Sequence, residues 1–322
     1  MPPPDGGGNG RALVAVTGAT GFVGPHLVAA LARRGFRLRL LVRRWSPLPS
    51  LAGVEAELVL GDLSDAAACR RLVAGADAVV HAAGLIKARR PEAFFAVNRD
   101  ATARLSEVAD ALAPQATFLL LSSLAAREPG LSPYGASKRA AEEAVAGRAG
   151  PRLTVRAPAV YGPGDRETLA YFRAVARGIA PQPRVAGARL SLIHVADLAE
   201  ALALTIERSP ENSLYEIDDG REGGYTYGEM AVAAARALGR PSARMLRVPR
   251  FVMAGLGRLN ALGHAMGGPV QILTPAKVRE IFHPDWTVHD RRLAAALAFT
   301  PRYDLATGFA HTISWYRARE WL

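Results

Sequence analysis

The chain has 322 residues, of which 50% are hydrophobic and 21% are charged, a balance that suits a globular protein with a sizeable core. Its formal net charge is +11, but no compact basic block occurs, so the composition does not indicate nucleic-acid binding. Lysine occurs only at Lys87, Lys138 and Lys277, and the other basic residues are arginine. An anionic cofactor or an anionic membrane surface is compatible with this charge.

Three features bear on the location of the protein. The first ten residues are rich in proline and glycine and lack the basic and apolar regions of a signal peptide, so 1–10 is predicted to be a loose tail. No apolar run reaches the roughly 18 residues that would indicate a membrane-spanning helix. The single Cys69 cannot form an internal disulfide. These features predict a cytoplasmic protein, with contact at the inner face of the membrane left open.

Short apolar runs alternate with amphipathic stretches through the first half of the chain. Continuous apolar runs separated by helices are typical of a parallel sheet buried on both faces, so we predict an α/β fold with a doubly wound Rossmann sheet. Strands are predicted at 12–16, 38–42, 56–60, 78–80 and 117–121, with further strands at 153–157 and 213–217, and helices at 25–34, 66–73, 98–112 and 137–147.

The alternation of apolar runs and amphipathic stretches stops after about Gly164, which predicts that the chain forms a domain and a separate lobe. Residues 11–165, with later strands from about 191–219, are expected to form a dinucleotide-binding domain. Residues 166–322 are expected to form mainly a smaller, largely helical substrate-binding lobe.

The first strand leads into a glycine-rich turn with the sequence Thr-Gly-Ala-Thr-Gly-Phe-Val-Gly at 17–24. Glycines between a strand and a helix let the backbone approach a pyrophosphate, which the helix N-terminus stabilises. The alternative is a tight turn with no ligand, but the position on the first strand of a βαβ pattern favours a dinucleotide. The predicted cofactor contacts in this turn are Gly18, Thr20, Gly21, Phe22 and Val23.

The end of the second predicted strand holds Arg43 and Arg44 where an acidic residue would bind an unphosphorylated ribose. An arginine can bind a 2′-phosphate through two hydrogen bonds, so NADP(H) is the preferred cofactor. In a chain so rich in arginine the pair can also be incidental, and NAD(H) stays the alternative.

The next two strands also end in residues placed to meet a ligand, because a doubly wound sheet binds at its carboxyl edge. Asp62 and Leu63 follow the third strand, and Ala82, Ala83 and Gly84 follow the fourth. Asp62 is expected to accept from the adenine amine, unless it caps the following helix. The small residues would let the backbone lie beside the cofactor, unless they serve packing alone.

The strongest combination of residues is Ser123, Tyr134 and Lys138. Tyr134 and Lys138 are four apart, so on a helix they share one face. A neighbouring ammonium and a cationic nicotinamide would lower the pKa of the tyrosine, and a serine hydroxyl can hydrogen-bond a reacting oxygen. This set predicts hydride transfer at a carbonyl or alcohol carbon, and it disfavours an idle cofactor-binding subunit.

At this point the chain resembles the extended short-chain dehydrogenase/reductase family, also called the NAD-dependent epimerase/dehydratase family. The resemblance implies that Tyr134 is the acid–base group, that Lys138 holds the nicotinamide ribose and that Ser123 binds the substrate oxygen. It also implies cofactor contacts near Asn98, Pro158 and Val160, although Arg-Ala-Pro at 156–158 departs from the usual Arg-Pro pair. The matching elements are 17–24, 97–98, 122–123, 134–138, 160–165 and 194–197.

The substrate is less well defined. Dehydratases of the family carry an acidic pair after the catalytic hydroxyl, whereas Leu-Ala-Ala follows Ser123 in this chain. This difference disfavours dehydration but does not bear on epimerisation. The chain looks similar to bacterial reductases of 3-oxo-ceramide-type lipids and to 3β-hydroxysteroid dehydrogenases in general appearance. We therefore predict reduction of a ketone on a lipid-like substrate. A nucleotide-sugar 4-epimerase or 4-reductase is the alternative, with Arg184, Arg189 and Arg279 as diphosphate ligands.

The segment 244–273 combines many large apolar residues with arginines and has no carboxylate. It predicts a hydrophobic pocket lined by residues such as Phe251, Met253 and Leu256. The alternatives are a core helix pair and attachment to an anionic bilayer through Arg247, Arg250 and Arg258. A homodimer is also left open.

Four residues near the C-terminus look like metal ligands, but their spacing fits no standard site, so a structural role and no metal are predicted. They are His283, Asp285, His289 and Asp290.

Overall fold

The structure is a computed structural model that describes residues 11–43, 53–265 and 273–322. Its centre is a parallel sheet of seven strands in the order β11-β6-β5-β4-β1-β2-β3. Every one of the predicted strands is present in this sheet. The strands are β1 Leu13–Thr17, β2 Arg37–Val42, β3 Glu57–Leu60, β4 Ala78–His81, β5 Thr117–Ser123, β6 Arg152–Ala157 and β11 Ser213–Glu216.

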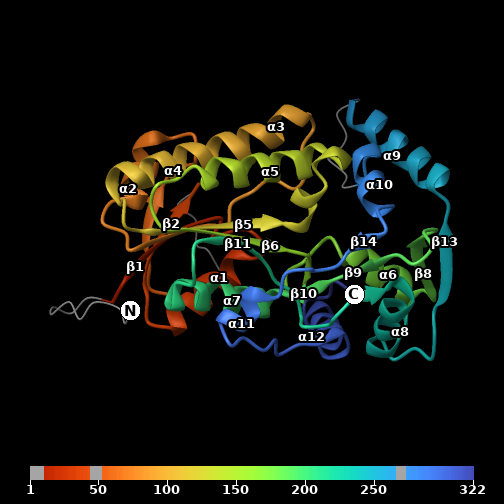
Figure 1. Ribbon diagram of the computed structural model, residues 1–322. Coiled ribbons are helices and arrows are strands. Elements are labelled where there is room, and N and C mark those ends of the chain that lie inside the picture. The colour runs from red at the N-terminus through yellow and green to blue at the C-terminus, as the bar shows by residue number, and fades with distance from the viewer. Residues whose placement is uncertain (1–10, 44–52, 266–272) are drawn as a thin grey trace.

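Helices cover both faces of the sheet, as Figure 1 shows. On one face, α2 (Ala66–Val73), α4 (Ala101–Leu112) and α5 (Pro133–Ala146) bury residues such as Leu105 against the strands. On the other face lie α1 (Gly24–Arg33), α7 (Val195–Arg208) and α11 (Arg292–Ala296). The strand order turns at β1, between β2 and β4, which is where a doubly wound sheet opens a crevice for a ligand.

The start of the predicted helix at 98–112 is not regular. A short helix α3 (Pro91–Phe95) and a π-helical turn (Ala96–Asp100) precede α4, and Asn98 lies in that turn. Single π-turns inside helices are frequent at functional sites, and apolar periodicity does not reveal them. The helix predicted at 137–147 begins earlier, at Pro133, because Ser132 caps it by accepting a hydrogen bond from the Gly135 N–H at 2.9 Å.

The remaining elements lie beyond the carboxyl edge of the sheet, and some of them pack around an aromatic core that includes Tyr161, Phe172, Phe309 and Tyr316. Their strands are short and form small sheets, β7 with β10, β8 with β13, and β9 with β12 and β14. The elements are β7 Ala159–Tyr161, α6 Leu169–Ala176, β8 Ile179–Pro183, β9 Arg189–Leu190, β10 Leu192–His194, β12 Tyr225–Thr226, α8 Tyr227–Ala237, β13 Arg244–Val248, α9 Arg250–Ala265, α10 Pro275–Ile281, β14 Asp285–Trp286 and α12 Leu305–Ala318.

The structure corrects the expectation of a core helix pair at 244–273. In the described part of the segment, the strand β13 is followed by the helix α9, and much of the apolar surface faces solvent. Phe251 is 77% exposed and Leu259 is 66% exposed. Within the described residues, no helix has both the length and the apolar character needed to cross a membrane.

Candidate active site

The glycine-rich turn brings the ends of β1 and β4 into close contact. Gly18 has a φ of +77°, and a Cβ there would lie 2.6 Å from the Ala83 nitrogen, so a side chain is excluded. A Cβ at Gly24 would lie 2.2 Å from the Gly18 oxygen. Helix α1 then begins with no capping side chain, which leaves its first N–H groups available to an anion. The turn therefore fits the pyrophosphate of a dinucleotide.

At the adenosine end of this crevice, the structure removes the alternative that was given for Asp62. Asp62 does not cap α2, because Asp65 accepts the hydrogen bonds from the N–H groups of the first turn. Asp62 instead accepts from the Ser64 hydroxyl and N–H, and these bonds, with the nearby Arg43, lower the pKa of its carboxyl. Arg43 is exposed directly after β2, where a ribose phosphate could reach it, and Arg44 lies outside the described residues.

The predicted reactive residues come together at the carboxyl end of β5. Ser123 is the last residue of that strand, and Tyr134 and Lys138 both belong to α5. The Tyr134 hydroxyl lies near enough to the Ser123 side chain for Ser123 to act on its pKa. The Lys138 ammonium donates to the Leu121 carbonyl at 2.7 Å, and a Cβ built at Gly84 would lie 3.8 Å from it. The three side chains thus lie around one point beside the crevice.

Asn98 holds the backbone that follows β4 against α5. Its side-chain oxygen accepts from the Leu85 N–H at 2.7 Å, and its amide donates to the Leu85 carbonyl at 3.0 Å and to the Ser137 hydroxyl at 2.9 Å. Asn98 is 1% exposed, so these bonds are made away from bulk water. The π-helical turn therefore positions the wall of the crevice beside Lys138.

Burial sets the protonation of the reactive groups. It raises the pKa of Tyr134 to about 12, while the nearby Ser123 hydroxyl acts in the opposite direction. It lowers the pKa of Lys138 to about 8, against the opposing charge of Glu142. Lys138 is not among the groups that shift the pKa of Tyr134, so the expected lowering of the tyrosine pKa by the ammonium is not seen in this structure. At neutral pH the tyrosine is a protonated acid and the lysine is largely an ammonium.

A cavity of about 690 Å³ opens beside Ser123 and Tyr134. Its wall is mostly apolar and comes from segments far apart in the sequence. The side chains that sequence reasoning missed are Ile86, Phe94, Leu124, Tyr227, Ile281 and Trp286. They follow no periodicity along the chain, so no sequence pattern could have grouped them. Of the predicted cofactor contacts, Pro158 lines this cavity, whereas Val160 pairs with Ile193 between β7 and β10.

The predicted pocket residues Phe251, Met253 and Leu256 do not line the cavity. Helix α9 contributes Ala261 to the wall, while Phe251 and Leu256 are exposed to solvent at 77% and 49%. The prediction placed the pocket beside the right helix, but Phe251 and Leu256 lie on the side of that helix that faces solvent.

The three arginines proposed as diphosphate ligands do not converge. Arg279 lines the cavity and donates to the Leu131 carbonyl at 2.7 Å. Arg189 instead bonds the carbonyls of Gly223 and Gly224, and Arg184 is not part of the cavity wall. Three other basic residues, Lys87, Arg89 and Lys277, also line the cavity, so its wall still offers cations to a pair of phosphates.

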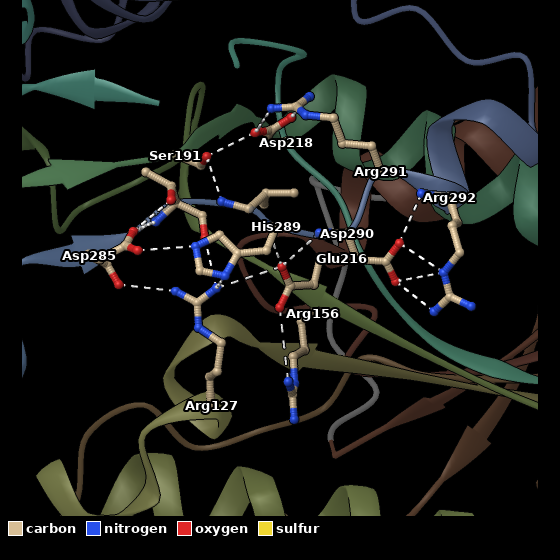
Figure 2. A network of polar contacts seen from close by, with 12 residues as sticks. Arg127, Arg156, Ser191, Glu216, Asp218, Asp285, His289, Asp290, Arg291 and Arg292 are labelled. Carbon is tan, nitrogen blue, oxygen red and sulfur yellow. Dashed lines mark hydrogen bonds and ion pairs between the residues drawn. The ribbon is translucent and has the colours of Figure 1, made fainter. Parts of the chain in front are cut away.

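A polar network braces one wall of the cavity (Figure 2). Arg127, four residues after Ser123, donates to the carbonyls of Thr287 at 2.8 Å and Asp285 at 3.0 Å, on either side of Trp286. Glu216, at the end of β11, accepts from the His289 N–H at 2.9 Å and lies 3.7 Å from Arg127. The segment that carries Trp286 is thereby tied to the sheet.

The residues that resembled metal ligands have protein partners in this region. His289 pairs with Asp285 at 3.1 Å, Asp290 pairs with Arg292 at 2.8 Å, and the His283 ring lies 4.7 Å from the Trp286 ring. Among the described residues, no group of three or more potential ligands is placed to hold a metal ion.

Comparison with known proteins decides the family. The model of the NAD dependent epimerase/dehydratase family matches residues 14–218. The chain belongs to this family. It is 43% identical over 312 residues to a ceramide reductase of Caulobacter vibrioides (strain NA1000 / CB15N), a match that covers 97% of this chain and 96% of that protein.

Other relatives extend the comparison. A farnesyl-dihydroquinoline-oxide ketoreductase of Stigmatella aurantiaca is 30% identical over 226 residues, covering 64% of this chain and 67% of that protein. The solved structure of MoeE5 in complex with UDP-glucose and NAD is 25% identical, with a TM-score of 0.70 over 96% of this chain and 99% of that one. The family and its reductase members identify the chain as an NAD(P)-dependent oxidoreductase of the short-chain dehydrogenase/reductase type.

Proposed function

We propose that this family member reduces a ketone of a hydrophobic, lipid-like substrate, of the 3-oxo-ceramide or 3-ketosteroid type, with NADP(H) as its cofactor. The observation that carries the proposal is the mostly apolar cavity of about 690 Å³ that opens on Ser123 and Tyr134. Cavities that bind small organic ligands usually measure roughly 300–1,000 Å³. The 43% identity to a ceramide reductase, over nearly the whole length of both chains, supports the same substrate class.

The chemistry follows from the protonation of the three reactive residues. When bound, the dinucleotide supplies a hydride to the carbonyl carbon. Tyr134 donates its proton to the carbonyl oxygen, so the ketone becomes a secondary alcohol, and its pKa of about 12 keeps the proton in place until then. Ser123 holds the carbonyl oxygen by a hydrogen bond, and the Lys138 ammonium binds the nicotinamide ribose.

One polar pair in the cavity suits a substrate with a polar group near its ketone. Glu280 is 5% exposed, and Lys277 donates to it at 2.5 Å. Both side chains line the cavity, and the carboxylate is near enough to Tyr134 for its charge to raise the pKa of the phenol. An amphiphile could place a hydroxyl or amide on this pair while its chain lies against the apolar wall.

The substrate class is tested by turnover with NADPH against two sets of compounds. The first set contains the lipid ketones, which are 3-oxo lipids dispersed in detergent and 3-ketosteroids. The enzyme is expected to oxidise NADPH in their presence. The UDP-hexoses and UDP-4-keto sugars are expected to give no reaction. Turnover of the nucleotide sugars without turnover of any lipid ketone would overturn the proposal in favour of a 4-epimerase or 4-reductase.

The cofactor preference has its own test. If Arg43 and Arg44 bind the 2′-phosphate, the wild type binds NADPH more tightly than NADH, and the R43A/R44A variant loses most of this difference. The expected loss is roughly 1.5–3 kcal/mol for each charge-assisted hydrogen bond. Titrations followed by cofactor fluorescence give the dissociation constants of NADPH and NADH for each protein.

The matched control is Arg37→Ala, an exposed arginine at the opposite end of β2. It changes the net charge without touching the ribose site, so it should leave the ratio of the two constants unchanged. Equal affinities of the wild type for NADPH and NADH would show that the arginine pair is incidental.

A further inference from the structure

Helix α9 presents an apolar outer face to solvent. This outer face consists of Phe251, Val252, Leu256, Leu259 and Leu262, whose exposed fractions range from 40% to 77%. At the 100° per residue of an α-helix, the five positions fall within an arc of roughly 140°. A protein in water rarely leaves so continuous a stripe of large apolar side chains uncovered.

The opposite side of α9 faces the protein. A Cβ at Gly257 would lie 3.1 Å from the Thr274 carbonyl carbon, so the helix backbone lies directly on the start of α10. Asn260 donates to the Leu273 carbonyl at 3.1 Å, and Ala261 lines the cavity. One helix thus separates the cavity from the outer face. Figure 1 shows this helix, α9, beside α10.

The charged residues of α9 and of β13 before it are all basic. Between Glu229 and Glu280 the sequence contains no carboxylate but eight basic residues. Arg247, Arg250 and Arg258 are exposed beside or within α9, and no ion pair links them to a carboxylate within the described parts of the chain. An anionic surface with an apolar interior is complementary to both features.

We propose that the outer face of α9 docks on an anionic lipid bilayer, with its leucines in the headgroup–acyl boundary and its arginines on the lipid phosphates. Docking in this way would place one wall of the cavity against the membrane. The inference goes beyond the reductase activity and does not depend on it, because docking can be measured without substrate or cofactor.

The test uses the full chain and sedimentation with vesicles of phosphatidylcholine, with or without phosphatidylglycerol. The wild type is expected to sediment with the phosphatidylglycerol vesicles and to be released by salt. The affinity of L256E/L259E for these vesicles is expected to fall by at least about tenfold, because two apolar contacts become charges. R247E/R250E/R258E is expected to lose roughly a hundredfold, since each basic residue near an anionic surface contributes to binding.

The matched control is Leu112→Glu. Leu112 is 43% exposed at the end of α4, and α4 ends at the edge of the sheet opposite to the cavity. This variant should sediment as the wild type does, and unchanged thermal midpoints would show that all variants are folded. Turnover of a short, water-soluble ketone should be equal in all of them, which separates a loss of docking from a failure of the reductase proposal.

Three results would overturn the proposal. The first is no sedimentation of the wild type with phosphatidylglycerol vesicles, and the second is equal sedimentation of L256E/L259E. The third is a dimer in solution that L256E/L259E dissociates while vesicles bind neither protein, because a second copy would then be what covers the outer face.

Discussion

Replacing Tyr134 with phenylalanine is expected to lower kcat for ketone reduction by roughly 10²–10⁴-fold, the usual contribution of a general acid. The change removes the hydroxyl near Ser123 and leaves the ring, whose centroid lies 6.2 Å from that of Phe94. Packing is therefore preserved, and NADPH binding should change by no more than about twofold. Steady-state rates and a cofactor titration on the same preparation measure both quantities.

The matched control is Tyr227→Phe. Tyr227 also lines the cavity, but Ser123 does not act on the pKa of its hydroxyl, so the loss of this hydroxyl should leave most of kcat in place. Lys138→Ala should weaken both turnover and cofactor binding, which distinguishes the ribose ligand from the proton donor. Near-full turnover by the Tyr134→Phe enzyme would remove the proposed mechanism.

Replacing Glu216 with alanine is expected to lower the free energy of unfolding by about 3–5 kcal/mol, the usual result of removing one partner of a buried ion pair. Glu216 is 5% exposed and lies 3.7 Å from Arg127 and 3.9 Å from Arg156. Its loss also leaves the His289 N–H without its acceptor. Because this network holds the segment of Trp286, KM for the substrate should rise as well (Figure 2).

Glu200→Ala is the control for that measurement. Glu200 pairs with Arg33 and Arg34 at the surface and is 36% exposed, so its removal should cost no more than about 1 kcal/mol. Denaturant unfolding of the three proteins gives the comparison. An equal, small loss in both variants would mean that Glu216 does not brace the cavity wall.

The sequence was sufficient for the sheet because local pattern and burial agree there. Each predicted strand is a short apolar run, and β1 is buried at every position, as a central parallel strand must be. The two residues Tyr134 and Lys138 were also predictable, because a helix fixes the relative direction of positions four apart. The π-helical turn that holds Asn98 was not, since it depends on contacts with Leu85 and Ser137 from elsewhere in the chain.

The cavity shows where sequence reasoning ends. Phe94, Tyr227 and Trp286 meet there because three separate segments pack at the carboxyl edge of the sheet, and no local pattern encodes that meeting. The apolar content of α9 was visible in the sequence, but periodicity does not say whether an apolar stripe faces a core or solvent. That distinction needed the position of α10, which occupies the other side of the helix.

The transfer of deuterium from NADPH labelled at the reactive position of the nicotinamide tests the central claim most directly. The enzyme is incubated with the labelled cofactor, a 3-oxo lipid and a UDP-hexose together, and both product pools are analysed by mass spectrometry. We predict one deuterium in the lipid product, on the carbon that bears the new hydroxyl, and an unchanged nucleotide sugar. An unlabelled lipid together with an epimerised or reduced sugar would contradict the account.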